Sequence, residues 1–214
     1  MLQKILEHYH AGGFFMHLIL LTSFIGVGII LERVKVLSAA SNIRKDELLN
    51  HINAFILQGQ LDKAISVTAQ VKNPLTNIVR AGLISVSNGG GPEEVQTSMD
   101  AVALREIPKL ERRIGLLSML SNVATLVGLL GTVSGMINAF GAVANVSPSE
   151  KATILANSIS EAMNCTAFGL LVAIPLLFAF GFLMSKAQEV TDDVHEASVS
   201  TLNFILANKN KLKA

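Results

Sequence analysis

Three long apolar runs dominate the pattern of hydrophobic and polar positions along the chain. They cover residues 14–31, 114–140 and 162–184, and His17 is the only ionisable residue within them. An apolar helix of about 20 residues reaches across the hydrocarbon core of a bilayer. The runs therefore predict three transmembrane helices. Buried core helices are the weaker alternative, because three such runs are rare in one chain of 214 residues.

The first run favours a retained span over a cleaved signal peptide. It is longer than the usual hydrophobic stretch of a signal peptide, and Lys4 is the only basic residue before it. Glu32 and Arg33 follow it at once, as in a stop-transfer segment, whereas Ser38–Ala40 is only a weak cleavage-like sequence. We therefore expect residues 14–31 to remain as the first transmembrane helix.

The distribution of lysine and arginine predicts how the chain crosses the membrane. Lys4 alone precedes the first run and Lys151 alone lies between the second and third, whereas eleven basic residues lie in 32–113 and four in 185–214. Basic residues accumulate in cytoplasmic segments. We therefore expect a periplasmic N-terminal segment (1–13), a cytoplasmic domain (32–113), a periplasmic loop (141–161) and a cytoplasmic C-terminal helix (185–214).

The segments between the runs carry helical patterns. Apolar residues at three- and four-residue steps predict amphipathic helices over 43–56, 61–73 and 75–83. Pro92 starts another helix, which we expect to bend at Pro108 and continue into the second run. The predicted fold class is an all-α integral membrane protein whose second and third transmembrane helices extend into a helical cytoplasmic domain.

Composition argues against several classes of protein. Half of the residues are hydrophobic, 15% are charged and the mean hydropathy is +0.50, which disfavours a disordered chain and an ordinary soluble enzyme. The net charge of +1 disfavours a nucleic-acid binder. A single cysteine, Cys165, excludes an internal disulfide, and the histidines show no ligand spacing beyond His8 and His10. We therefore expect no enzyme activity, no cofactor and no metal site.

The second run carries a stripe of small and polar residues. Its members recur at three- or four-residue steps and share one helical face: Ser118, Ser121, Asn122, Thr125, Gly128, Thr132 and Gly135. Small residues allow helices to approach closely, and hydroxyls form hydrogen bonds across an interface or line a hydrated path. The stripe fits either pure helix packing or a pore lining, and we expect it to pack between subunits.

The third run opens beside a carboxylate and contains a proline. Glu161 and Thr166 lie at the two edges of a helical face about 140° wide, so both cannot point at one atom on a straight helix. A carboxylate near a membrane span suggests function, and a solvated interfacial Glu161 is the alternative. Pro175 removes a backbone donor and frees a carbonyl in the middle of the run, which predicts a kink or local hydration.

Acidic and basic residues are absent from the interior of the three runs. A self-contained proton pump needs a titratable group near the middle of the membrane. If this chain conducts protons, the central carboxylate therefore comes from another polypeptide.

The second and third runs resemble the signatures of the ExbB/TolQ/MotA proton-channel family, and the ExbB/TolQ branch most closely. The similar stretches are Gly128–Phe140 and Ile159–Pro175, together with Gly59–Leu83 in the cytoplasmic segment. One departure is Phe180-Gly181, where many relatives have Tyr-Asn. The resemblance covers nearly the whole chain and agrees with the three predicted spans.

The resemblance implies a function and an assembly. Members of the family form pentamers around the transmembrane helices of two ExbD/TolR-like partner chains, and protons cross the bacterial inner membrane beside a partner Asp to power work on the cell envelope. The pore-lining roles fall on Thr132, Glu161 and Thr166. We assign helix packing to Gly128, Gly131, Gly135, Gly169 and Pro175. A non-conducting membrane scaffold is the alternative function.

Overall fold

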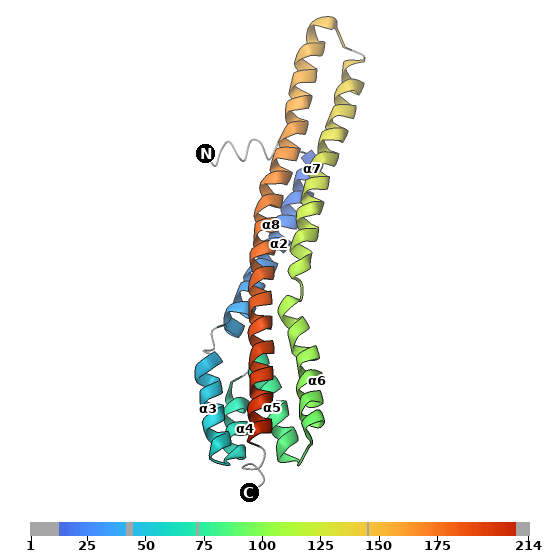
Figure 1. The fold of residues 1–214 in the computed structure, drawn as a ribbon. Helices are drawn as coiled ribbons and strands as arrows, with labels where there is room; N and C mark the ends of the chain where they lie inside the picture. The colour runs from blue at the N-terminus through green and yellow to red at the C-terminus, as the bar shows by residue number, and fades with distance from the viewer. Residues whose placement is uncertain (1–12, 42–44, 72, 145, 209–214) are drawn as a thin grey trace. The chain divides into compact units, whose positions relative to one another are not determined.

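The structure is a computed structural model that describes residues 13–41, 45–71, 73–144 and 146–208. Its helices are α2 (Gly13–Ser41), α3 (Lys45–Leu57), α4 (Leu61–Gln70), α5 (Pro74–Ser87), α6 (Pro92–Glu111), α7 (Ile114–Val143) and α8 (Pro148–Ala207) (Figure 1). The described residues contain no strand, so the all-α prediction is confirmed. Most of the predicted N-terminal segment, with His8 and His10, and the last six residues of the predicted C-terminal helix lie outside the described residues.

Three helical segments are long and apolar enough to cross a membrane. By length and composition these are Gly13–Ser41, Pro92–Val143 and Pro148–Ala207. The second segment combines α6 and α7. Each segment contains one of the predicted apolar runs and continues beyond it. The prediction of three apolar, span-length helices is therefore confirmed.

Two compact units divide the chain. The first unit comprises Met1–Glu32 and Arg113–Phe182, and the second comprises Arg33–Arg112 and Leu183–Ala214. Helices α2 and α8 each contribute residues to both units. The boundaries fall within a few residues of the ends of the apolar runs, so the change in composition along the sequence coincides with a change in packing.

An apolar core holds the second unit together. Its buried residues come from α3, α4, α5, α6 and the C-terminal part of α8: Ile52, Ile56, Ala64, Leu75, Ile78, Val79, Leu83, Val86, Val95, Met99, Val194, Ala197 and Ile205. Burying apolar side chains from each amphipathic helix is the main favourable term in such packing. The three short helices predicted before residue 88 correspond to α3, α4 and α5, and that prediction is confirmed.

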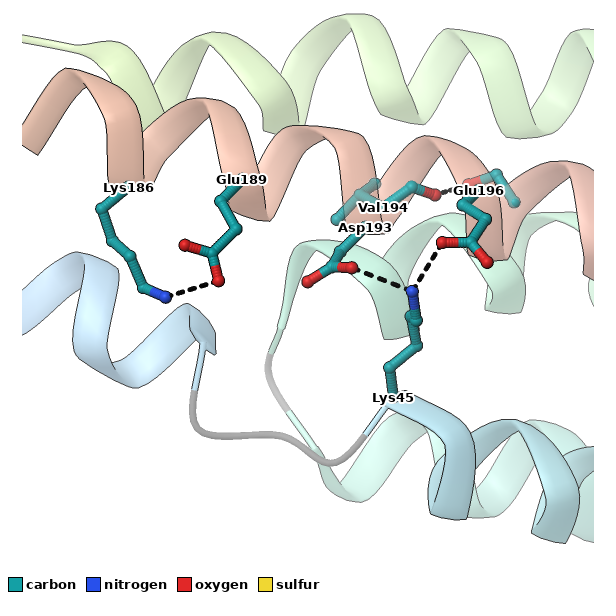
Figure 2. A network of polar contacts seen from close by, with 7 residues as sticks. Lys45, Lys186, Glu189, Asp193, Val194 and Glu196 are labelled. Atoms are coloured by element: carbon teal, nitrogen blue, oxygen red, sulfur yellow. Dashed lines mark hydrogen bonds and ion pairs between the residues drawn. The ribbon is translucent and has the colours of Figure 1, made fainter.

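Lys45, the first residue of α3, joins that helix to α8. Its Nζ lies 2.9 Å from Asp193 Oδ1 and 2.7 Å from Glu196 Oε2 (Figure 2). The hydrogen bonds that Lys45 donates to Asp193 and then to Glu196 stabilise its charged form and raise its pKa above the ordinary value. Both carboxylates are more than half exposed, so each ion pair contributes only about 0.2–1 kcal/mol. The cluster therefore orients α3 more than it stabilises the unit.

Asn73 fixes the start of α5. Its Oδ1 accepts the backbone N–H of Leu75 at 2.9 Å, and its own N–H donates to Thr76 Oγ1 at 3.1 Å. Its Nδ2 also donates to the backbone oxygen of Ala40 at 2.9 Å. The residue is 4% exposed. One buried amide therefore caps α5 and ties it to the end of α2.

The junction between α6 and α7 differs from the expected bend at Pro108. Helix α6 runs through Pro108 to Glu111, and the break falls at Arg113, which adopts a left-handed φ of 66°. That conformation costs a non-glycine residue roughly 1–2 kcal/mol. Arg113 Nη1 lies 2.8 Å from both carboxylate oxygens of Glu32, a charge-assisted pair that opposes this strain. Helix α6 therefore continues past Pro108, and the interruption between α6 and α7, which the sequence did not predict, lies at Arg113.

The segment predicted as a loop, 141–161, is largely helical. Helix α7 continues to Val143 and α8 begins at Pro148. Ser147 Oγ donates to Glu150 Oε2 at 2.7 Å, and proline at the first helical position favours helix initiation. These first turns of α8 lie outside the apolar runs, which is why the apolar pattern did not predict them, and the periplasmic location of the segment stays a prediction.

We expect Asn73→Ala to lower the free energy of unfolding by about 1–3 kcal/mol, because it removes the cap of α5 and the bond to Ala40. The thermal unfolding midpoint in mild detergent measures the effect. Asn88→Ala is the matched control, since Asn88 is exposed at the other end of α5. Equal midpoints for the two variants would contradict the proposed role of the cap.

Candidate functional site

Helices α7 and α8 pack against each other, antiparallel, through glycines (Figure 1). A Cβ atom at Gly128 would lie 3.1 Å from the backbone oxygen of Cys165. A Cβ atom at Gly169 would lie 2.8 Å from the backbone oxygen of Ala124. The two backbones are therefore in direct contact, which a larger residue at either glycine would prevent.

Two further glycines of α7 extend this contact. A Cβ atom at Gly131 would clash with Cys165 Sγ, and one at Gly135 would lie 2.7 Å from Ala162 Cβ. The helix that covers this face belongs to the same chain. Within one chain these glycines therefore pack against α8, and a further contact of this face with other subunits stays a prediction. Pro175 is exposed within an unbroken α8.

Hydroxyl groups continue the α7–α8 contact and bring Thr132 and Thr166 together. Thr166 Oγ1 lies 3.0 Å from the backbone oxygen of Gly128 and 3.3 Å from Thr132 Oγ1. Thr132 Oγ1 donates to the backbone oxygen of Leu129 at 2.6 Å. Further along, Ser121 Oγ donates to the backbone oxygen of Ala173 at 2.8 Å. Two of the three predicted pathway residues thus form one hydrogen-bonded group.

Glu161 occupies a different place in the first unit. It lines a cavity of about 340 Å³ together with residues of α2, α7 and α8: Gly13, Phe14, Phe15, Gly131, Ser134, Gly135, Asn138, Ser158, Ala162 and Cys165. Neither Thr132 nor Thr166 is among the described residues that line it. This separation agrees with their angular positions on the helix, which place Glu161 and Thr166 at opposite edges of one face.

Sequence reasoning missed the polar residues around Glu161. Ser134 and Asn138 are four residues apart on α7, and Ser158 precedes Glu161 by three residues on α8. That spacing puts each pair on one helical face, so the polar lining was detectable. The contribution of Phe14 from α2 was not detectable, because the local sequence pattern does not show which helix lies beside α7 and α8.

Among the described residues, no group of three or more His, Cys, Asp or Glu is arranged to hold a metal ion. Cys165 is a buried free thiol. Gly181, in the stretch that departs from many relatives, faces open space. The polar groups of the candidate site are therefore hydroxyls, one amide and one carboxylate.

Comparison with known proteins gives a consistent result. Residues 70–196 match the model of the MotA/TolQ/ExbB proton channel family. The chain is 27% identical to an ExbB homolog of Methanothermobacter thermautotrophicus over 89% of its own length and 66% of the relative's. It is 34% identical to the Tol-Pal system protein TolQ of Haemophilus influenzae, over 50% of the chain and 48% of the relative. It is 34% identical to the biopolymer transport protein ExbB of Xanthomonas campestris pv. campestris, over 49% and 44%. The chain thus spans about half to two thirds of the length of these curated relatives.

Gly169→Ala should lower the free energy of unfolding by about 1–3 kcal/mol, because the added methyl group overlaps the backbone of α7. Gly181→Ala makes the same change in the same helix where the added methyl meets open space, and it should leave stability nearly unchanged. Thermal unfolding in mild detergent compares the two. A Gly169→Ala protein as stable as Gly181→Ala would show that the close backbone contact is dispensable.

Proposed function

Because the chain belongs to the MotA/TolQ/ExbB proton channel family, we propose that it is a proton-channel subunit of a stator-type membrane motor. The chain is a multi-pass membrane protein with three span-length apolar helices. The motor would couple proton flow to work on the cell envelope, in transport, envelope integrity or motility. The observation that carries the proposal is the match over residues 70–196, which contain every polar side chain assigned to the pathway.

The threonine group supports a role in proton movement. The hydroxyls of Thr132 and Thr166 lie 3.3 Å apart within the α7–α8 contact of the first unit. In an apolar span, hydroxyls can order water or relay hydrogen bonds. We assign the pathway to Thr132, Thr166 and Glu161, with the threonines organising water and Glu161 supplying the titratable group.

A second polypeptide completes the proposed pathway. The apolar runs of α7 and α8 contain no acidic or basic residue, so the central carboxylate comes from a partner of the ExbD/TolR type. Large apolar side chains remain exposed on both helices: Leu126, Leu129, Val133, Ile137, Leu171, Ile174, Phe178 and Phe182. Such a surface suits lipid, neighbouring copies and a partner helix. We propose a pentamer that encloses two partner helices.

The proposed topology follows the distribution of basic residues. Residues 1–13 and 141–161 would face the periplasm, and 32–113 and 185–214 the cytoplasm of a bacterial cell. The membrane would then be crossed by residues 14–31, 114–140 and 162–184, with the N-terminus periplasmic and the C-terminus cytoplasmic.

A non-conducting scaffold is the second candidate. The observation in its favour is that Gly128 and Gly169 serve packing within one chain, which explains part of the small-residue stripe without conduction. The two functions make different demands on the hydroxyls of Thr132 and Thr166 and on the carboxylate of Glu161. A channel subunit needs these groups, whereas a scaffold does not.

We expect the purified chain alone to conduct few protons in proteoliposomes, since it lacks a carboxylate within its apolar runs. Co-reconstitution with its single-span partner should produce flux driven by the proton gradient. A pH-sensitive dye inside the vesicles measures both. Strong specific flux from the chain alone would contradict the need for a partner carboxylate.

Glu161→Gln and Thr166→Val should reduce proton-driven work to a small fraction while the complex remains assembled, and Thr132→Val should follow closely. Loss of one interhelical hydrogen bond costs only about 0.6 kcal/mol on average in a membrane, too little to dissociate the complex. Activity is normalised to the amount of intact complex. Glu150→Gln and Thr153→Val are matched controls on exposed positions of α8 and should retain activity. Full activity in all three pathway variants would favour the scaffold.

A further inference from the structure

The exposed face of α7 carries one amide in a row of apolar side chains, here called the α7 seam. Its residues recur at three- and four-residue steps, as in helices that pack on one another, and all are exposed: Met119, Asn122, Leu126, Leu129, Val133 and Met136. The Asn122 carboxamide has no hydrogen-bond partner within the part of the chain that the structure describes. Inside an apolar span, such an amide gains a bond when another helix supplies the partner. The α7 seam therefore suits a second helix.

The exposed face of α8 has a row with the same spacing, here called the α8 seam. It consists of Ala167, Leu171, Ile174, Phe178 and Gly181, all exposed. Pro175, also exposed, has no N–H to donate to the backbone oxygen of Leu171 four residues before it. In transmembrane helices, neighbouring groups bond to the carbonyls that a proline frees. The α8 seam thus presents a backbone acceptor beside apolar side chains.

The amide donor and this acceptor lie at the same height on the helix pair. Gly169 packs against the backbone oxygen of Ala124. Because α7 and α8 are antiparallel, two residues back along α7 and two residues on along α8 bring Asn122 level with Leu171. Each residue lies about 160° around its helix from that contact, so the two point in opposite directions. Within one chain, they therefore cannot bond to each other.

We propose that copies of this chain join head to tail, the α7 seam of one against the α8 seam of the next. The Asn122 carboxamide donates a hydrogen bond to the Leu171 backbone oxygen of the neighbouring copy. Faces on opposite sides of one helix pair make a heterologous contact, which closes into a ring when the rotation permits. An axis along the membrane normal keeps every copy at one height, so the donor meets the acceptor.

A second copy is the occupant because this chain itself supplies the matching acceptor at the matching height. One polar group in an apolar seam fixes the register of two packed helices, since a shifted helix would leave the amide unpaired. The ring rests on the proposed function, and the contact at Asn122 names what aligns its copies.

Cysteine cross-linking tests which faces meet. Asn122→Cys and Leu171→Cys, combined in a Cys165→Ala background, are oxidised in native membranes, where a disulfide needs Cα atoms about 4.4–6.8 Å apart. The matched control replaces Leu171→Cys by Leu170→Cys, because Leu170 is also exposed at nearly the same height but lies about 100° around α8. We expect a ladder of covalently joined copies from the first pair, with at least about tenfold less product from the control.

The first pair would overturn the proposal if it gave only monomers, or no more joined copies than the control. Joined copies in a complex that shows no proton flux would leave the contact standing and remove the proposed channel function. Proton flux from a complex whose copies do not join would remove the contact and leave that function standing.

A double-mutant cycle tests the hydrogen bond itself. Asn122→Leu removes the amide at similar size, and Pro175→Ala restores an N–H that bonds to the Leu171 oxygen within α8. Asn122→Leu should weaken association of the copies about threefold per contact, but hardly at all in the Pro175→Ala background. Energy transfer between labelled copies diluted into lipid vesicles measures association. Asn157→Leu, at an exposed position of α8 outside the apolar runs, is the matched control and should have no effect.

Equal weakening by Asn122→Leu in both backgrounds would overturn the proposal, because the amide would then bond to a different group. Weakening that appears only when the partner chain is present would also overturn it and would identify a partner helix as the occupant. No weakening in either background would show that lipid covers the α7 seam.

Discussion

The first unit depends on the close approach of α7 and α8 at Gly128 and Gly169. Each glycine lies against the backbone of the opposite helix, so neither position accepts even a methyl group without displacement. Only at this separation can Thr166 Oγ1 reach the backbone oxygen of Gly128 and lie 3.3 Å from Thr132 Oγ1. The polar chemistry of the site is therefore a consequence of backbone packing.

The same contact explains why Glu161 and the threonines occupy separate places. Where Gly131 and Gly135 meet Cys165 and Ala162, the helices leave no space between them. Towards the connection between α7 and α8, the polar side chains and α2 instead enclose a cavity beside Glu161. Close backbone packing and a polar-lined cavity thus occupy different parts of one helix pair.

The second unit is stabilised mainly by an apolar core. Five helices supply this core, as in a soluble domain, and hydrogen bonds and ion pairs orient its helices. Asn73 caps α5 and binds Ala40, while Lys45 joins α3 to Asp193 and Glu196.

The three apolar helices, the short helices before residue 88 and the family could all be predicted from the sequence. The length of an apolar run, its periodicity and a local motif are properties of contiguous residues. Helical periodicity also placed Glu161 and Thr166 at opposite edges of one helical face. The tertiary structure was needed to show that α8 of the same chain covers the glycine face of α7, and that Phe14 of α2 lines the cavity beside Glu161. It also revealed that Lys45 pairs with Asp193, 148 positions away. Periodicity along a sequence predicts which residues share one face of a helix. Which other helix covers that face depends on contacts between residues far apart in the sequence, and these are seen only in the folded chain.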